Sequence, residues 1–328
     1  MDKIAFASDI ERKSIFIEAA DKLNISESIV EKDFWVSWVL EKIFENNELS
    51  QILCFKGGTS LSKAFNLIDR FSEDIDLILS ESIVLNKNET LIQSSKTKQV
   101  EFIKIIEERA LEYIRTNLFK KITGVLGSTC FVYPDNEDGH SLYIKFPHVF
   151  NYSYIQQEIK LEIGPLALWN PNNRYSISSF LTKALPELKL IEPVVPIIKP
   201  ERTFWEKITI LHHEHHRPVT SPLQPRYSRH YYDVYKMGNN EVKNIALANT
   251  ELLIEVVNFK KRFYPRGWAN YDAALPGTIC ILPAKYNIQS LAEDYIKMQK
   301  MLFGEIPQWD TILSNLQKLE IEINKIGI

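Results

Sequence analysis

Two aspartates separated by one residue are the strongest candidates for chemistry in this 328-residue chain. Asp74 and Asp76 lie in the segment 71–77, which reads Phe-Ser-Glu-Asp-Ile-Asp-Leu. On a strand, residues two apart project to the same face, so both carboxylates would converge on one point. Two neighbouring negative charges need a cation, and their oxygen atoms suit Mg²⁺. The pattern predicts a magnesium site, and two ions about 3.5–4 Å apart would support in-line displacement at phosphorus.

A pair of glycines precedes these acids, with Gly58 sixteen residues before Asp74. Gly57 and Gly58 allow positive φ angles and a close approach of the backbone to a ligand. The residues that follow, 59–65, have a helical pattern, and a helix start directs free N–H groups and a positive dipole end outward. We therefore expect the glycine turn to bind a phosphate.

A third acid would be needed to activate the incoming nucleophile, and Glu162 is the candidate. It lies in the segment 157–164, Gln-Glu-Ile-Lys-Leu-Glu-Ile-Gly, whose alternation places Leu161 and Ile163 on a buried face. Glu162 would then face the pocket of the two aspartates, as third ligand or as base. Each element alone is common, since an Asp-x-Asp is most often a solvated strand face and a Gly-Gly pair is usually only a turn.

The elements that must position these residues follow from periodicity. Helical patterns open the chain, with Asp9 and Ser26 as N-caps and a helix over 27–44. Segments 52–55, 74–79, 128–133, 141–147, 154–163 and 175–181 read as strands, and 82–97 as a loop before a helix over 98–119. Three prolines within 192–200 indicate an extended connector, and the remainder is mostly helical. We expect a domain over 1–199 with N-terminal helices, and a helical domain over 200–328 that completes the cleft.

Composition excludes several classes of protein. A net charge of −3 does not favour a general nucleic-acid coat, although a local basic patch could still hold RNA. The three cysteines are too few and too scattered for a disulfide framework or a clustered zinc site. No apolar leader or membrane-spanning stretch is visible, so the expected location is the cytoplasm, with no membrane partner.

Two further clusters, one of histidines and one of basic and aromatic residues, each allow two interpretations. The segment 211–217, Leu-His-His-Glu-His-His-Arg, places His212 and His216 at the spacing of helical zinc ligands, but a polar helix end is the favoured interpretation. Basic and aromatic residues could bind a polynucleotide or simply form an ordinary helix surface. These are Arg217, Arg226, Tyr227, Arg229, His230 and Tyr231, with Arg262, Arg266 and Trp268 raising the same question.

The order of a glycine turn, two carboxylates and a third carboxylate resembles the polymerase-β-like nucleotidyltransferases. Over 55–79 the chain more closely resembles the AbiEii/AbiGii toxin family, the toxin halves of bacterial abortive-infection and toxin–antitoxin pairs. Weaker similarity extends to 202–207 (Arg-Thr-Phe-Trp-Glu-Lys) and 229–235 (Arg-His-Tyr-Tyr-Asp-Val-Tyr). The resemblance implies an α/β (α+β) core with a mixed sheet and a mainly helical C-terminal domain. It also implies Mg²⁺, a nucleoside triphosphate donor and, in some members, transfer to tRNA.

By the same resemblance, Lys207 would hold the triphosphate and Asp233 would complete the pocket. From the residues alone, a surface lysine or a structural ion pair between these two would be the more common outcome. The full set expected to bind the nucleotide is Gly57, Gly58, Thr59, Ser60 and Lys207, assisted by Arg70 or Ser72. The third acid departs from a sharp family motif, so the assignment of Glu162 follows from its place in the chain.

The leading functional hypothesis is therefore a magnesium-dependent nucleotidyltransferase with tRNA as acceptor. It would act as the toxin of a type IV-like toxin–antitoxin or abortive-infection system, with a cognate antitoxin encoded nearby. Two alternatives stay open: a protein or small-molecule acceptor, and a non-catalytic module that binds a nucleoside triphosphate to control association with a partner.

Overall fold

The chain divides into two units, which a computed structural model describes over residues 1–151 and 156–326. Unit 1 comprises residues 1–65 and 71–198, and unit 2 comprises residues 66–70 and 199–328. The short segment 66–70 thus belongs to unit 2, although its neighbours in sequence on both sides belong to unit 1. Within the described residues, no helix is long and apolar enough to cross a membrane.

Unit 1 is built on a mixed sheet, to which seven strands contribute within the described residues, in the order β3-β4-β5-β2-β1-β7-β6. Adjacent strands are antiparallel except for two parallel pairs, β2 with β5 and β1 with β7. The strands are β1 Leu53–Lys56, β2 Ile75–Leu79, β3 Phe131–Pro134, β4 Ser141–Lys145, β5 Glu158–Gly164, β6 Asn172–Ser176 and β7 Val194–Ile198.

The central strands bury one face and leave the other polar near the candidate site. In β5, Ile159, Leu161 and Ile163 are buried, while the alternate residues are half-buried or exposed. Their partners across the ladder include Ile75 and Leu77 of β2, which are also buried. Because side chains alternate along a strand, this register commits Glu162 and Asp76 to the opposite, polar face.

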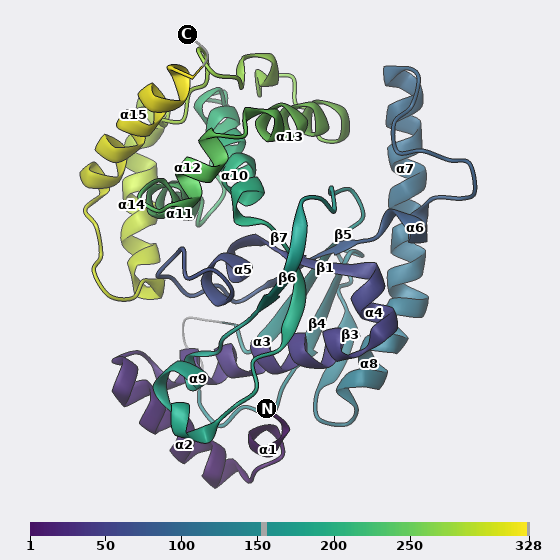
Figure 1. Ribbon diagram of the computed structural model, residues 1–328, viewed down its shortest axis with the longest axis vertical. Helices are drawn as coiled ribbons and strands as arrows, with labels where there is room; N and C mark the ends of the chain where they lie inside the picture. The colour runs from purple at the N-terminus through teal and green to yellow at the C-terminus, as the bar shows by residue number, and fades with distance from the viewer. Residues whose placement is uncertain (152–155, 327–328) are drawn as a thin grey trace. The chain divides into compact units, whose positions relative to one another are not determined.

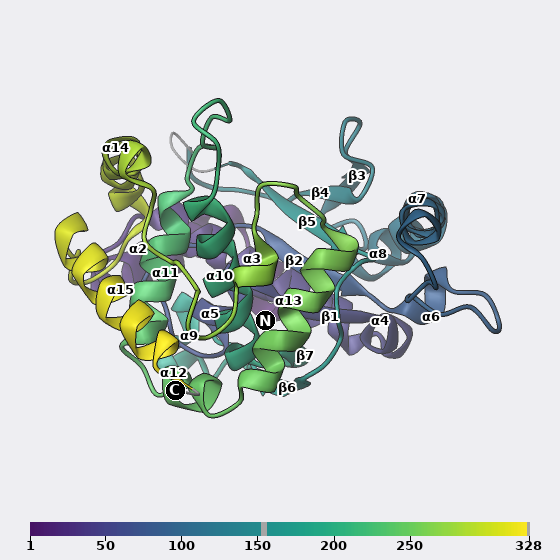
Figure 2. The ribbon, with the colours of Figure 1, turned by 90° about the horizontal axis from the view of Figure 1, so that it is seen from above.

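Helices surround this sheet (Figure 1), and α3 supplies much of the core of unit 1. Trp35 of α3 is fully buried and stacks on Phe146 with 5.8 Å between the ring centroids. At the outer edge, α8 packs beside β3, and α7 leads into α8 through a π-helical turn over Ile114–Leu118 (Figures 1 and 2). The helices of unit 1 are α1 Asp2–Ala5, α2 Asp9–Leu23, α3 Glu27–Glu45, α4 Asn47–Ile52, α5 Gly57–Lys63, α6 Glu81–Val84, α7 Lys96–Tyr113, α8 Phe119–Leu126 and α9 Phe180–Ala184, with a 3₁₀ turn over Pro186–Leu188.

Unit 2 is helical, with α10 packed among α11, α12 and α13 (Figure 2). Phe204, Ile208 and Leu211 form the fully buried stripe of α10. The helices are α10 Pro200–His215, α11 Ser228–Gly238, α12 Val242–Leu247, α13 Thr250–Phe263, α14 Ile288–Met298 and α15 Trp309–Asn324, with 3₁₀ turns over Tyr271–Ala273, Lys285–Asn287 and Gln299–Met301.

The α/β class with a mixed sheet and a helical C-terminal region is confirmed. Several local expectations need correction. The first N-cap is Ser8 instead of Asp9, because Ser8 and Glu11 form a reciprocal capping box. The expected connector over 192–200 contains β7, which lies inside the sheet and pairs with both β1 and β6.

Other boundaries shift by a few residues. Helix α5 begins at Gly57 itself. The first residues of the expected loop over 82–97 belong to α6. The expected strand over 175–181 overlaps the end of β6 and the start of α9. The strand expected over 154–163 corresponds to β5, and its first two residues lie outside the described residues.

Candidate functional site

The glycine turn and the second aspartate form one compact unit. Gly57 opens α5 with a φ of +83°, a conformation that residues with a Cβ rarely adopt. A Cβ built on Gly57 would lie only 1.9 Å from Oδ2 of Asp76. The carboxylate of Asp76 therefore rests against the backbone of the turn, and this contact requires glycine for both its dihedral angle and its lack of a side chain.

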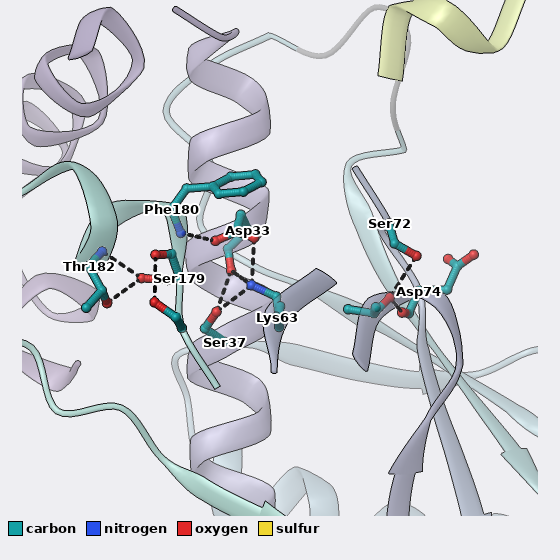
Figure 3. Close-up of polar contacts among 10 residues, drawn as sticks. Asp33, Ser37, Lys63, Ser72, Asp74, Ser179, Phe180 and Thr182 are labelled. Atoms are coloured by element: carbon teal, nitrogen blue, oxygen red, sulfur yellow. Dashed lines mark hydrogen bonds and ion pairs between the residues drawn. The ribbon is translucent and has the colours of Figure 1, made fainter. Parts of the chain in front are cut away.

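Hydroxyl groups fasten the start of α5 to the segment that precedes β2. The Thr59 hydroxyl donates a hydrogen bond to the main-chain carbonyl of Asp74, and its oxygen lies 2.9 Å from Oγ of Ser72. Ser60 donates to the carbonyl of Gly57 at 2.8 Å. Thr59 and Ser60 are buried. Figure 3 shows the contacts around Ser72 and Asp74, with the Asp74 carboxylate directed away from them. This geometry favours a positioning role for the hydroxyls of Thr59 and Ser60. Any contact of the turn with a ligand would then come from its main-chain N–H groups.

The register of the sheet brings two of the three expected acids together. Asp76 of β2 is the direct partner of Glu162 on β5, and in the other direction it is the partner of Lys56 on β1. Partners in a ladder share a face, so these three side chains lie in one row across the polar face. Glu162 is about half exposed, and its carboxylate forms an ion pair with Lys160 at 2.8 Å. Lys56 is a site neighbour that the sequence pattern did not single out.

Asp74 precedes β2 and faces the aromatic neighbours of the same region. Burial raises the pKa of Tyr143 on β4, and the carboxylates of Asp135 and Asp74 raise it further. Lys160 opposes these effects because its positive charge lies close enough to stabilise a phenolate. Asp74 therefore contributes negative charge to the polar face that carries Asp76 and Glu162.

The oxygen ligands of this row suit magnesium by their chemistry. Across residues 1–151 and 156–326, however, no group of three or more His, Cys, Asp or Glu side chains is gathered closely enough to hold a metal ion. Mg²⁺ is commonly bound by one or two carboxylates, with waters and substrate phosphates completing the octahedron. Asp74 and Asp76 fit that mode, whereas Glu162 would have to leave Lys160 to join them.

Two consecutive charged residues of α3 bind the two segments that carry the site, the residues before β2 and the helix α5. Lys32 is fully buried, and its ammonium lies 2.8 Å from the carboxylate of Glu73, the residue before Asp74. Asp33 accepts from Lys63 at the end of α5 at 2.6 Å and from the main-chain N–H of Phe180 at 2.7 Å (Figure 3). The clue in the sequence is a run of charges at 31–33 that directly precedes the apolar residues 34–36.

The later landmarks, Lys207 and Asp233, meet within unit 2. Lys207 of α10 donates to Asp233 of α11 at 2.7 Å, and both side chains are buried. Arg70, which the segment 66–70 carries into unit 2, binds the same carboxylate through two nitrogens, at 2.7 and 2.9 Å. The interpretation of Lys207 as a surface lysine is therefore wrong, and the ion pair is present.

Electrostatics around this carboxylate is dominated by cations. Burial alone would raise the pKa of Asp233, but the positive charges of Arg70 and Lys207 outweigh burial and hold that pKa well below its usual value. Burial lowers the pKa of Lys207, and the nearby Arg70 and Arg229 act in the same direction against the pull of Asp233. Two cations therefore contact one buried carboxylate directly.

The histidine cluster of α10 does not form a zinc site. Nδ1 of His212 accepts from the main-chain N–H of Cys280 at 3.0 Å, and Nε2 contacts the carbonyl of Asn270 at 3.0 Å. His216 also uses both ring nitrogens, with the His212 carbonyl and the Asn270 amide. Both rings tie the end of α10 to the loop around 270, so the polar helix end is the correct interpretation.

Two of the basic and aromatic residues in the stretch 217–231 are buried. Arg217 is 5% exposed and bound to Glu214 through two nitrogens, at 2.6 and 2.8 Å. Tyr231 is 1% exposed. Tyr231 is therefore one of the buried tyrosines of a helix, and neither residue offers a surface to a polynucleotide.

The class of the protein, a nucleotidyltransferase, follows from the family to which its sequence belongs. The sequence matches, over residues 38–315, the family described as the nucleotidyl transferase AbiEii toxin of type IV toxin–antitoxin systems, and the chain belongs to that family. It is thus a nucleotidyltransferase toxin, and membership implies a nucleoside triphosphate substrate and a cognate antitoxin.

Solved structures include distant neighbours of this chain. JHP933 from Helicobacter pylori is 13% identical, with a TM-score of 0.45 over 92% of this chain and 94% of that one. The nucleotidyltransferase toxin MenT4 from Mycobacterium tuberculosis H37Rv is 13% identical, with a TM-score of 0.43 over 94% of this chain and 96% of that one. Among curated proteins, no relative matches the sequence.

Proposed function

We propose that this enzyme transfers a nucleotidyl group from a nucleoside triphosphate to RNA, with tRNA as the acceptor and Mg²⁺ bound by Asp74 and Asp76. The observation that carries the proposal is the contact between the Asp76 carboxylate and Gly57. This contact supports the proposal because a carboxylate oxygen, the kind of ligand that Mg²⁺ prefers, lies beside the glycine turn that would receive the phosphate. Glu162 stands in the same row of the polar face.

The proposed reaction is an in-line displacement at the α-phosphorus. A hydroxyl oxygen of the acceptor forms a bond to this phosphorus, the bond to the oxygen that bridges the α- and β-phosphates breaks, and pyrophosphate leaves. The hydroxyl proton passes to Glu162, the proposed base, which must release Lys160 to accept it. Bound Mg²⁺ would supply positive charge for the phosphate oxygens.

Lys207 and Arg70 are the proposed contacts for phosphate oxygens in unit 2. Both cations are buried beside the carboxylate of Asp233, and guanidinium and ammonium groups form strong, charge-assisted hydrogen bonds with phosphate oxygens. Asp233 would hold both side chains in a fixed orientation, which is a positioning role. Gly57 and Gly58 would contribute main-chain N–H groups, and Ser72 would contribute through its contact with Thr59.

The test is nucleotide transfer by the purified protein, using each of the four α-labelled nucleoside triphosphates with Mg²⁺ and total tRNA. We expect labelled tRNA with at least one triphosphate, and loss of labelling with chelator or in Asp74→Ala and Asp76→Ala. Asp21→Ala, an exposed change in α2, is the matched control and should retain labelling. Equal labelling by the Asp74 and Asp76 variants would refute the metal assignment.

The same experiment separates the two alternatives. Label that appears in a protein or a small molecule, with none in tRNA, would replace the acceptor and keep the site. Tight triphosphate binding without pyrophosphate release, unaffected by Mg²⁺, would instead indicate a binding module.

A further inference from the structure

An exposed basic segment follows the last turns of α13 in unit 2. Residues 258–268 read Asn-Phe-Lys-Lys-Arg-Phe-Tyr-Pro-Arg-Gly-Trp, with four cations and no acid between Glu255 and Asp272. Arg262, Tyr264 and Arg266 are exposed. This local charge contrasts with the chain as a whole, whose net charge is −3.

Trp268 gives this segment a fixed aromatic ring. The guanidinium carbon of Arg217 lies 5.0 Å from the centroid of the indole, and that of Arg266 lies 5.7 Å from it. Arg217 is held in place by its two bonds to Glu214. The ring of His213 meets the indole edge to face at 5.5 Å. The half-buried tryptophan is therefore supported from within unit 2, whereas Arg266 lies over it from the exposed segment.

Stabilisation of α13 accounts for only part of this charge. Cations in the last turn of a helix interact favourably with its dipole, which explains Lys260, Lys261 and Arg262. Arg266 and Trp268 come after the helix ends at Phe263, so they do not serve this purpose. Lys261 is paired with Asp272, but within residues 1–151 and 156–326 neither Arg262 nor Arg266 forms an ion pair.

We propose that Arg262, Arg266 and Trp268 form a docking surface for an unpaired segment of RNA. The two guanidinium groups would bind phosphates, and Arg266 would leave the indole to do so. A base would then stack on the indole in its place, as single-stranded nucleic acids do on aromatic side chains. An acidic protein partner would satisfy the arginines but would make no use of the aromatic face of Trp268. The surface rests on the proposed function only in the claim that the bound RNA is the acceptor.

The test measures binding of a fluorescent, unstructured 12-nucleotide RNA to the full-length protein without any nucleoside triphosphate. Replacing both arginines, in Arg262→Gln with Arg266→Gln, should weaken binding roughly tenfold at 0.15 M salt. The slope of log affinity against log salt should fall by about 1.4, because each phosphate contact to a single strand contributes about 0.7. The matched control removes the same charge from exposed positions elsewhere in unit 2, by Lys285→Gln with Lys318→Gln.

The outcomes separate this surface from the transferase activity. Equal affinity of the two double variants would overturn the proposal, and so would equal affinity of the wild type for the RNA and for its duplex. Wild-type protein that releases pyrophosphate but does not bind the RNA would also overturn it, while leaving nucleotidyl transfer intact. RNA binding lost only in the arginine variant, without pyrophosphate release in any protein, would support the surface and refute the proposed reaction.

Discussion

Replacing Gly57 by alanine tests the central contact of the site. The added Cβ would lie 1.9 Å from Oδ2 of Asp76, whereas ordinary contact begins at 3.4 Å. The carboxylate must therefore retreat by about 1.5 Å, and misplacement of about 1 Å in an active site can cost roughly 100-fold in rate. The φ of +83° adds a backbone penalty of about 1–3 kcal/mol to the folded state. We expect nucleotide transfer by Gly57→Ala to fall at least ~100-fold.

Two other glycines separate the collision from the backbone penalty. Gly127 has a φ of +59°, but nothing lies within 4 Å of its hypothetical Cβ. Gly127→Ala should therefore lower the free energy of unfolding by about 1–3 kcal/mol and leave transfer unchanged. Gly124 lies inside α8, with open space and no positive φ, so alanine there should stabilise the protein by roughly 0.5–1 kcal/mol.

The assay combines initial rates of labelled transfer, titration of Mg²⁺ and urea unfolding for all three variants. Gly57→Ala should lose rate and require more Mg²⁺, because the displaced carboxylate is the proposed metal ligand. Wild-type transfer by Gly57→Ala would refute the reasoning. An equal loss of rate in Gly127→Ala would show that backbone strain alone accounts for the effect.

Three further predictions concern buried charges. Lys63→Met leaves the buried Asp33 carboxylate without its cation and should cost about 3–5 kcal/mol in urea unfolding. Lys22→Met, at an exposed pair, should have a much smaller effect, and equal losses would contradict the burial argument. Burial lowers the pKa of His212 to about 4, so its neutral form stabilises the fold above the unfolded pKa near 6.5. The free energy of unfolding should therefore decrease as pH falls from 6.5 towards 4, and His212→Gln should show a shallower decrease over that window. The depressed pKa of Asp233 contributes stability above about pH 4, and this stability is lost on further acidification. Asp233→Asn should therefore be less stable at pH 7, and its free energy of unfolding should depend less on pH below 4. The same acid dependence in Asp233→Asn as in the wild type would refute the assignment.

The sequence alone was sufficient for the enzyme class and much of the class of fold. Aspartates two residues apart on a strand must share a face, and an apolar alternation around Glu162 commits that residue to the polar face. These are local rules, so they hold without knowledge of distant contacts. For the same reason, the order of a glycine turn, two aspartates and a third acid could be recognised from the sequence alone.

Strand β7, which contains Pro196, shows where local reasoning ends. Its three-proline neighbourhood reads as a connector, because proline lacks an N–H for the ladder. Pairing with β1 and β6 nevertheless places it inside the sheet, and this pairing depends on residues more than 100 positions away for β1. Tertiary packing can outweigh a local preference in this way, as it does for many strands.

Only the tertiary structure decided which charges act together. Lys32 and Asp33 are charged residues of a helix, and because both are buried, each needs a partner. Lys32 pairs with Glu73 before β2, and Asp33 pairs with Lys63 of α5. Arg70 lies four residues before Asp74 in sequence but belongs to unit 2, where it binds Asp233. A buried charge must be paired, but its partner is set by the path of the chain in space, which spacing along the sequence does not encode.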